Sequence, residues 1–195
     1  FSQGWIGNVR KLAAAHWWDG LSINRVQDNY VVQWGDADAE DQAKAKALPE
    51  GLAVMPESDY VTSLIAAPLG AIPKANPGVV PNGYTDIYIR SSDPLGGSGV
   101  SGFSLGFPVG LLATNPRKGS EDENVDVTGR KVGEVWPVHC YGMVGVGRDL
   151  SPNTGSGAEL YVVIGHAPRH LDRNIALVGR VIEGIEHLSS LPRGH

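Results

Sequence analysis

Hydrophobic positions near the N-terminus recur at helical spacing and then change to a strand pattern. Apolar side chains lie three or four residues apart over residues 4–16, and the dipeptide DG follows shortly after, so the pattern predicts a helix here. Two short runs rich in β-branched and aromatic residues come next, at residues 21–26 and 30–34. The polar tripeptide QDN separates them, which predicts a β-hairpin.

The rest of the chain is divided between loop-rich and strand-rich stretches. Residues 37–51 are charged and predict a short helix or a loop at the surface. Residues 66–136 are rich in Gly and Pro and predict loops with one or two strands, such as TDIYIR and VGLLAT. Three later runs, VHCYGMVGVG, AELYVVIG and NIALVGRVIEG, predict strands, and EGIEHLSSL predicts a short helix. Helices at the ends with strands between them indicate a mainly β protein, closed or nearly closed.

Composition narrows the classes of partner. The 195 residues suffice for one domain with a substantial core, and a net charge of -5 argues against a nucleic-acid partner. No apolar run reaches the roughly 18 residues of a membrane-spanning helix, and the N-terminus lacks a basic start followed by an apolar block, so we expect no membrane partner. The single Cys140 excludes an internal disulfide and a Cys-based zinc site, and it leaves the compartment open.

Two motifs raise the possibility of nucleophilic catalysis. The pentapeptide GFSLG around Ser104 fits G-x-S-x-G, which requires a preceding strand and a following helix, and the sequence predicts neither. A serine hydrolase built on Ser104 and His139 is therefore disfavoured. His139 and Cys140 are neighbours, so in a strand they would face opposite sides of the sheet, which disfavours a dyad.

Metal and nucleotide signals are also weak. His166 and His170 are four residues apart, but Pro168 lies between them and no carboxylate signature accompanies the pair. The glycines of GMVGVG have the wrong spacing for a dinucleotide fingerprint. We expect neither a metal nor a cofactor.

Three blocks, in a fixed order, carry a resemblance to a known family. They are WWDGLSINRVQDNYVVQWGD, GMVGVGRDLSPNTGSGAELYVVIG and HLDRNIALVGRVIEGIE, within residues 5–36 and 141–187. They resemble the Y-D-G-x-x-F-H-R-V, M-A-N-A-G and L-D-G-x-x-x-V-F-G blocks of the cyclophilin family of peptidyl-prolyl isomerases. The resemblance implies an eight-stranded antiparallel β-barrel capped by two helices. It also implies a single domain over residues 1–195, with a loop-rich insertion at about 37–135 and without the family's first and last strands.

The resemblance assigns Arg25 to the arginine that reaches into the family's proline-binding groove. Chemistry supports such a role, because amide resonance gives rotation about an X-Pro bond a barrier of about 18–20 kcal/mol. The proline nitrogen gains a lone pair in the twisted state, and a guanidinium that donates to it would stabilise that state over the planar amide. The alternative is a salt-bridged surface arginine on an edge strand.

The same resemblance assigns a substrate-binding groove. Tyr30, Val31, Tyr161 and Leu171 would hold the proline ring, Gln33 would bind substrate backbone, and Glu159 stands where the family has a second glutamine. Met143, Val144, Gly145 and Val146 correspond to the M-A-N-A stretch, which pairs with extended peptide. His170 replaces the tryptophan that governs cyclosporin binding, so we expect weak binding of that drug.

Three further departures indicate a related pocket that is not identical. Asn24 and Ile175 stand where the family has histidines, and Trp34 replaces a glycine. Gly145 keeps its backbone groups but lacks the asparagine side chain, which predicts low substrate affinity.

Two functions follow as hypotheses. The first is a prolyl isomerase that assists protein folding and acts on proline-containing peptides and unfolded proteins. The second is a non-catalytic cyclophilin-fold module that binds proline-containing peptides, or a partner protein through the 37–135 insertion. That insertion would rim the groove, dock a partner or be decoration. Related bacterial isomerases occur in cytoplasm and periplasm, and of these we favour the periplasm.

Overall fold

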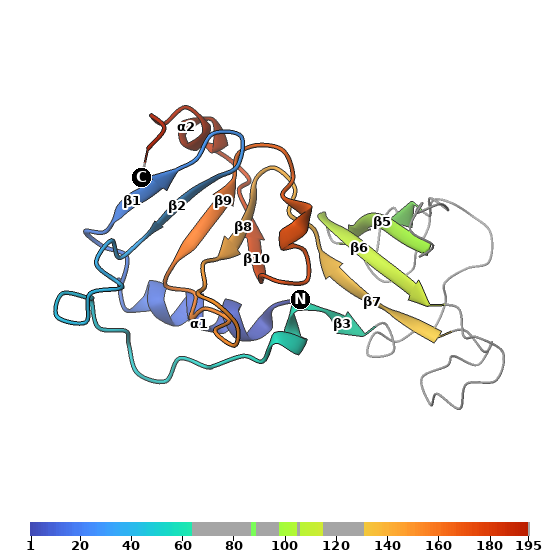
Figure 1. Ribbon diagram of the computed structural model, residues 1–195, viewed down its shortest axis with the longest axis horizontal. Coiled ribbons are helices and arrows are strands. Elements are labelled where there is room, and N and C mark those ends of the chain that lie inside the picture. The colour runs from blue at the N-terminus through green and yellow to red at the C-terminus, as the bar shows by residue number, and fades with distance from the viewer. Residues whose placement is uncertain (64–86, 89–97, 105, 115–130, 195) are drawn as a thin grey trace. The chain divides into compact units, whose positions relative to one another are not determined.

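A computed structural model describes residues 1–63, 87–88, 98–104, 106–114 and 131–194 (Figure 1). The chain forms two compact units. The first combines residues 1–60 with residues 139–195, and the second is Val61–Val138. The second unit takes up most of the stretch expected to be an insertion. The single-domain organisation stays a prediction.

The first unit is a five-stranded antiparallel sheet with two α-helices (Figure 1). The strands follow the order β1-β2-β9-β8-β10 across the sheet. Their bounds are Ser22–Val26 for β1, Val31–Gly35 for β2, Met143–Val146 for β8, Leu160–Val163 for β9 and Leu177–Arg180 for β10. The helices are α1, Gln3–Ala14, and α2, Ile185–Ser189, and the 3-10 turns are η1, Glu57–Tyr60, and η3, Arg169–Leu171. The mainly β class is thereby confirmed, and both predicted helices and the predicted hairpin are present. The charged residues 37–51 form turns and loop, the second of the two forms predicted for them.

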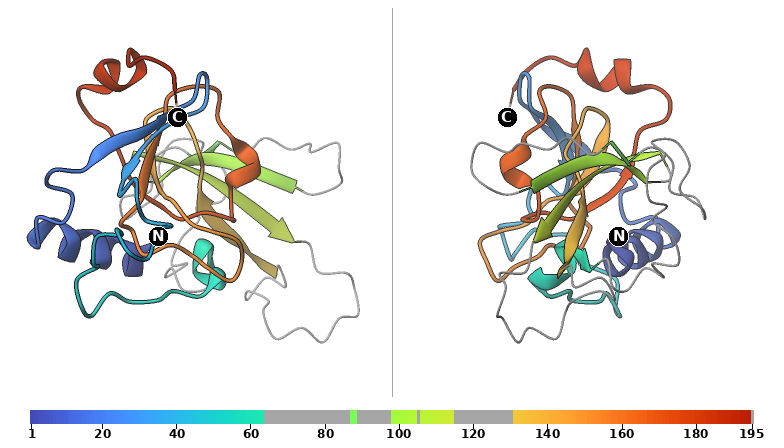
Figure 2. Two further views of the ribbon diagram at one scale, coloured as in Figure 1. Left: turned by 60° about the vertical axis from the view of Figure 1, so that its left-hand side comes forward. Right: turned by 90° about the vertical axis from the view of Figure 1, so that its right-hand side faces the viewer.

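One face of this sheet carries the part of the hydrophobic core that packs with the two helices. Val32, Val162 and Val144 pair across three adjacent strands, and Trp34, Leu160 and Val146 form the next row. Directly paired residues share a face, so both rows point to the same side. The helices supply two further groups to this core: Trp5 and Val9 from α1, and Ile185 and Leu188 from α2. The two helices lie at opposite ends of the unit (Figure 2).

The second unit is a separate antiparallel sheet of order β3-β7-β6-β5-β4. Its strands are β3, Thr62–Ser63, β4, Ile87–Tyr88, β5, Ser98–Ser104, β6, Phe107–Thr114, and β7, Lys131–Pro137. The sequence predicted the positions of β4 and β6 and wrongly assigned β5 and β7 to loops. Gly and Pro in SGVSGFS and KVGEVWP depress the local strand signal, and pairing with β6 compensates for it.

The β5–β6 hairpin shows which elements flank Ser104, the candidate nucleophile. A strand does precede Ser104, contrary to the sequence prediction, but the next element is strand β6 and not a helix. Ser104 pairs with Phe107 across the turn. A nucleophile elbow needs a strand-to-helix turn, so the hydrolase hypothesis has no structural support here.

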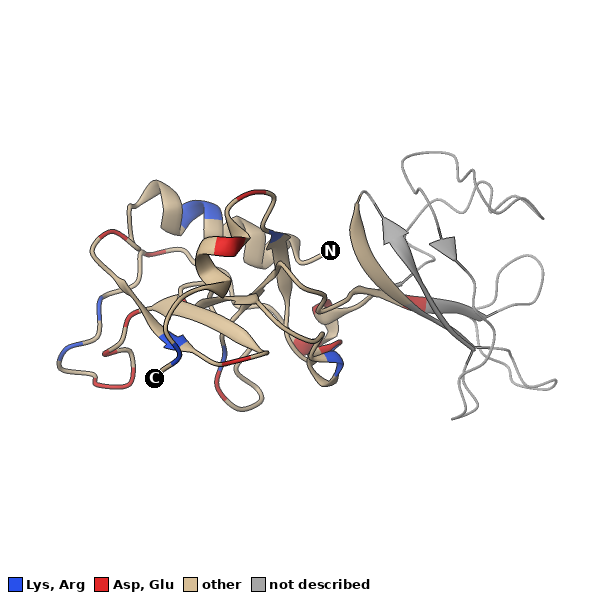
Figure 3. Ribbon diagram, turned by 90° about the horizontal axis from the view of Figure 1, so that it is seen from above, with Lys and Arg blue, Asp and Glu red and all other residues tan. Residues whose placement is uncertain are grey.

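No helix in the described part of the chain is long and apolar enough to span a membrane. Within the first unit, Lys and Arg are interspersed with Asp and Glu (Figure 3). The expectation that the chain has no nucleic-acid partner stays a prediction.

Asn8 joins α1 to two loops of the first unit. It is 1% exposed, and its Nδ2 donates to the carbonyls of Ala53 at 2.8 Å and Ser156 at 2.9 Å. Its Oδ1 accepts from the backbone N–H of Ala53 at 2.8 Å. The amide therefore satisfies three backbone groups that are distant from α1 in the sequence.

We expect Asn8→Ala to lower the free energy of unfolding by about 3 kcal/mol, because these backbone groups would lose their partners in a buried setting. Urea denaturation followed by circular dichroism measures the change. Arg10→Ala, at an exposed position of the same helix, is the control and should change stability little. Equal stability of the two variants would contradict this role for Asn8.

Candidate functional site

A row of directly paired residues crosses the sheet on the face opposite the core. Arg25 pairs with Gln33, Gln33 with Tyr161, and Tyr161 with Gly145. Paired residues share a face, so the strand register brings the predicted catalytic arginine and three predicted groove positions into one line. Val31 lies two residues from Gln33 and pairs with Val163, which places both on this face as well.

The Arg25 guanidinium is held by neutral groups. Its Nη1 donates to the Oε1 of Gln33 at 3.5 Å, and its Nη2 donates to the Oε1 of Gln27. Its Cζ lies 5.8 Å from the centre of the Tyr30 ring, a cation–π arrangement. In the part of the chain that the structure describes, no carboxylate forms an ion pair with Arg25. The salt-bridged alternative therefore receives no support, and the positive charge is available to a ligand.

An apolar cluster adjoins this arginine. Val31 and Tyr161 are buried at its centre together with Val163, and Tyr30, Leu171 and Ile175 pack around them, partly exposed. The His170 ring stacks on Tyr30 with centroids 6.2 Å apart and an interplanar angle of 12°. The four residues predicted to hold a proline ring are thus brought together, and Ile175 joins them where the family has a histidine.

Glu159 and Gln33 form a polar pair beside Arg25. The Nε2 of Gln33 donates to the Oε2 of Glu159 at 3.0 Å. Burial raises the pKa of Glu159, while hydrogen bonds from Gln33 and Asn24 act in the opposite direction and the nearby Asp36 carboxylate raises it further. An ionised carboxylate only accepts hydrogen bonds, so Glu159 turns the amide nitrogen of Gln33 toward itself and the amide oxygen toward Arg25.

An open groove of about 710 Å³ begins at this pair. Asn24, Gln33 and Glu159 line it at the sheet, and the remaining lining comes from Trp17, Ala158 and residues within 36–48 and 147–156. It therefore adjoins the side chains that lie next to Arg25.

The stretch corresponding to M-A-N-A lies in strand β8. Val144 and Val146 point into the core, and Met143 is 1% exposed. Strand β8 has β9 on one edge and β10 on the other, so its pairing partners are already strands of the sheet. Peptide binding by residues 143–146 stays a prediction, and their side chains offer little surface for it.

The structure shows where two departures from the family, Trp34 and Gly145, lie. Trp34 packs on the core face, away from the Arg25 row, so it does not alter the groove directly. Gly145 lies against Tyr161, and a Cβ at this position would collide with the phenol ring. With the Tyr161 ring in this position, residue 145 has no room for the family's asparagine.

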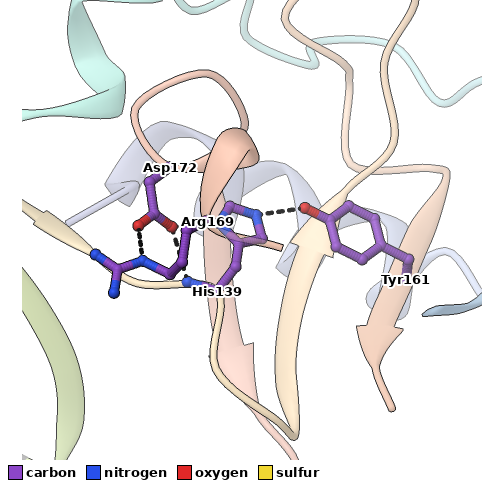
Figure 4. A network of polar contacts seen from close by, with 4 residues as sticks. All are labelled: His139, Tyr161, Arg169 and Asp172. Atoms are coloured by element: carbon purple, nitrogen blue, oxygen red, sulfur yellow. Dashed lines mark hydrogen bonds and ion pairs between the residues drawn. The ribbon is translucent and has the colours of Figure 1, made fainter. Parts of the chain in front are cut away.

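A buried network, missed in the sequence, anchors Tyr161 (Figure 4). The Nε2 of His139 lies 2.7 Å from the Tyr161 hydroxyl, and its Nδ1 lies 2.9 Å from the Oδ1 of Asp172. The backbone N–H of His139 also donates to Asp172, whose Oδ2 pairs with Arg169. The sequence suggested His139 only as a partner of Ser104 or Cys140, because no local pattern links it to positions 161 and 172.

The electrostatics of this network follow from burial and hydrogen bonding. Burial raises the pKa of Tyr161, which therefore stays protonated. Burial also acts to raise the pKa of Asp172, but hydrogen bonds from His139 and the Arg169 guanidinium outweigh it and lower that pKa. Asp172 is therefore ionised and accepts hydrogen bonds from His139.

The remaining candidate dyads and ligands do not assemble. His139 and Cys140 lie in a loop and not in the strand that the sequence predicted for them. Only His139 is fully buried. His166 contacts Asn29 through Nδ1 at 2.9 Å, whereas His170 stacks on Tyr30. The described residues contain no cluster of three potential metal ligands.

Comparison with solved structures supports the fold. The chain is similar to the crystal structure of cyclophilin AquaCyp293 from Hirschia baltica, with a TM-score of 0.61 and 24% sequence identity. The match covers 96% of this chain and 59% of that protein, so the chain spans about three fifths of its length. A comparison with curated proteins found no match.

The family assignment rests on a match over nearly the whole chain. The description "Cyclophilin type peptidyl-prolyl cis-trans isomerase/CLD" matches residues 5–195. The chain therefore belongs to the cyclophilin-type peptidyl-prolyl cis-trans isomerase family, as the three sequence blocks predicted.

We expect Glu159→Gln to stabilise the protein at about pH 7 and to lose this advantage toward about pH 4. Because the folded pKa of Glu159 is raised, its stabilising contribution is fully present below the unfolded pKa and is lost as the pH rises through the folded pKa. Thermal unfolding at several pH values measures the difference in Tm. The exposed Glu57→Gln serves as control, and a difference for Glu159→Gln that is constant over this pH range would contradict the prediction.

Proposed function

We propose that this chain accelerates cis–trans rotation about X-Pro peptide bonds, with Arg25 as its catalytic residue. One observation carries the proposal: a half-buried arginine without a carboxylate partner in the described part lies on the same sheet face as an apolar cluster. A proline ring on that cluster would present its nitrogen near the guanidinium. Family membership supports the reaction class.

The reaction requires stabilisation of a twisted amide. On twisting, the proline nitrogen loses conjugation and becomes a hydrogen-bond acceptor, which the planar amide nitrogen is not. Arg25 stays protonated and donates to this lone pair, so it binds the twisted state better than the planar state. One charge-assisted hydrogen bond contributes about 1.5–3 kcal/mol, or roughly ten- to a hundredfold in rate.

The apolar cluster supplies the rest of the proposed mechanism. Tyr30, Val31, Tyr161 and Leu171 would bind the proline ring and exclude water from it. Removing water favours the less polar twisted amide and strengthens the contact with Arg25. Gln33 would bind the peptide backbone, because the second hydrogen on its Nε2 remains after the bond to Glu159.

We further propose that the substrates are proline-containing peptides and unfolded proteins, and that the chain assists folding through them. Cyclosporin would bind weakly, because His170 lacks the indole N–H of the family's tryptophan. The runner-up is a non-catalytic binding module, which the compact second unit, Val61–Val138, favours as a separate surface for a partner.

Arg25→Ala should reduce the catalysed exchange rate of a short Ala-Pro peptide at least tenfold, because the donor to the proline nitrogen is lost. Exchange spectroscopy by NMR measures this rate without a coupling protease. Arg25→Lys should restore little, since a lysine has a different reach and no planar fork. Arg10→Ala is the matched control for removal of one positive charge.

Two outcomes would contradict the proposal. A folded wild-type protein that leaves the exchange at its spontaneous rate would favour the binding module. Full activity in Arg25→Ala would remove Arg25 from the mechanism.

A further inference from the structure

We propose that His139 is a positioning residue for the proline pocket: it fixes the Tyr161 ring and couples it to the segment that carries Leu171. This inference rests on the proposed function, because it concerns the same pocket. It assigns a role to a buried histidine that contacts no substrate.

Packing places the Tyr161 ring beside strand β8. Gly145 is its direct partner across the sheet, and the ring occupies the space where a side chain at residue 145 would lie. On its other flank the ring packs with Val31 and Val163. These contacts limit sideways movement of the ring but leave its hydroxyl in an apolar setting, where a lone polar group is costly.

His139 meets this requirement, and its tautomer follows from its partners. Asp172 is ionised and accepts only, so the Nδ1 of His139 carries the hydrogen and donates to it. The Nε2 is then an acceptor, and the Tyr161 hydroxyl donates to it over 2.7 Å. Each group in the chain Tyr161–His139–Asp172 is thereby satisfied in one orientation only.

The far end of this chain lies next to the pocket floor. Asp172 directly follows η3, the turn that contains Leu171, and it also binds the backbone N–H of His139 and the side chain of Arg169. Leu171 and Tyr161 belong to the same apolar cluster. His139 therefore connects a pocket residue on β9 to the segment that presents another, ten positions later in the sequence.

His139, on a third segment, therefore holds Tyr161 and the turn that carries Leu171 in a fixed relative position. Loss of the bond from Tyr161 to His139 would leave a buried hydroxyl unpaired, and the ring would rotate or draw in water. The binding of proline would then weaken, while Arg25 on strand β1 would keep its place. The effect should appear in Kd and KM more than in kcat.

Two substitutions at position 139 distinguish the contact made by Nδ1 from the contact made by Nε2. His139→Asn can reproduce the contact of Nδ1 with Asp172 but is too short to reach the Tyr161 hydroxyl. His139→Gln places an acceptor near the position of Nε2 and can keep the contact with Tyr161. Both replace the same buried imidazole by an amide, so they are matched in polarity.

The experiment measures the Kd of an Ala-Pro tetrapeptide by NMR titration, KM and kcat by exchange spectroscopy, and Tm by thermal unfolding. We expect His139→Asn to raise Kd and KM about tenfold with kcat within about twofold, and His139→Gln to recover most of the affinity. In a Tyr161→Phe background, His139→Asn should add little further loss, because the hydroxyl that it served is absent.

The remaining outcomes test the inference and the proposed function separately. Equal losses in His139→Asn and His139→Gln that follow Tm would indicate a purely structural role. An undiminished effect of His139→Asn in Tyr161→Phe would show that Tyr161 is not the residue through which His139 acts. A wild type that binds the peptide without accelerating exchange would contradict the proposed function alone, and the comparison of Kd values would still decide the role of His139. A wild type that does neither would overturn both.

Discussion

The site depends on the register of one antiparallel sheet. Four strands align Arg25, Gln33, Tyr161 and Gly145 in a single row, although these residues come from both ends of the chain. Because side chains alternate between faces, a slip of one residue in β2 would send Gln33 into the core and bring Val32 to the site. The two paired rows on the opposite face, one of valines and one that contains Trp34 and Leu160, oppose such a slip, since they would have to exchange burial for exposure. Core packing and site assembly are thus two results of the same pairing.

Two departures from the family are explained by the residues that they contact. The tyrosine at position 161 requires the glycine at position 145, which removes the family's asparagine, and its hydroxyl requires an acceptor, which His139 supplies. Likewise, the carboxylate of Glu159 selects one orientation of the Gln33 amide, where a glutamine would allow either. At positions 145 and 159, each departure from the family is thus matched by a contact with a neighbouring side chain.

Local patterns predicted the elements whose signals are strong. The helix at residues 4–16 corresponds to α1, and the hairpin around QDN corresponds to β1 and β2, because periodicity and turn residues there agree with the tertiary structure. Strands β5 and β7 escaped detection, since their Gly and Pro weaken propensity and their stability comes from pairing with β6. Trp34, which replaces a glycine of the family, counted in the sequence as a sign of an altered pocket, whereas strand alternation puts it on the core face.

By itself, the sequence determined the mainly β class and the family, since ordered motif blocks survive divergence at single positions. Through the resemblance it also predicted a common groove for Arg25, Gln33 and Tyr30. The tertiary structure alone decided which side chains meet across long separations. The link from His139 to Tyr161 and Asp172 spans 22 and 33 positions, and no local period encodes contacts at such distances. The same holds for Gly145 against Tyr161, because a collision between a side chain and a ring exists only after two strands have paired.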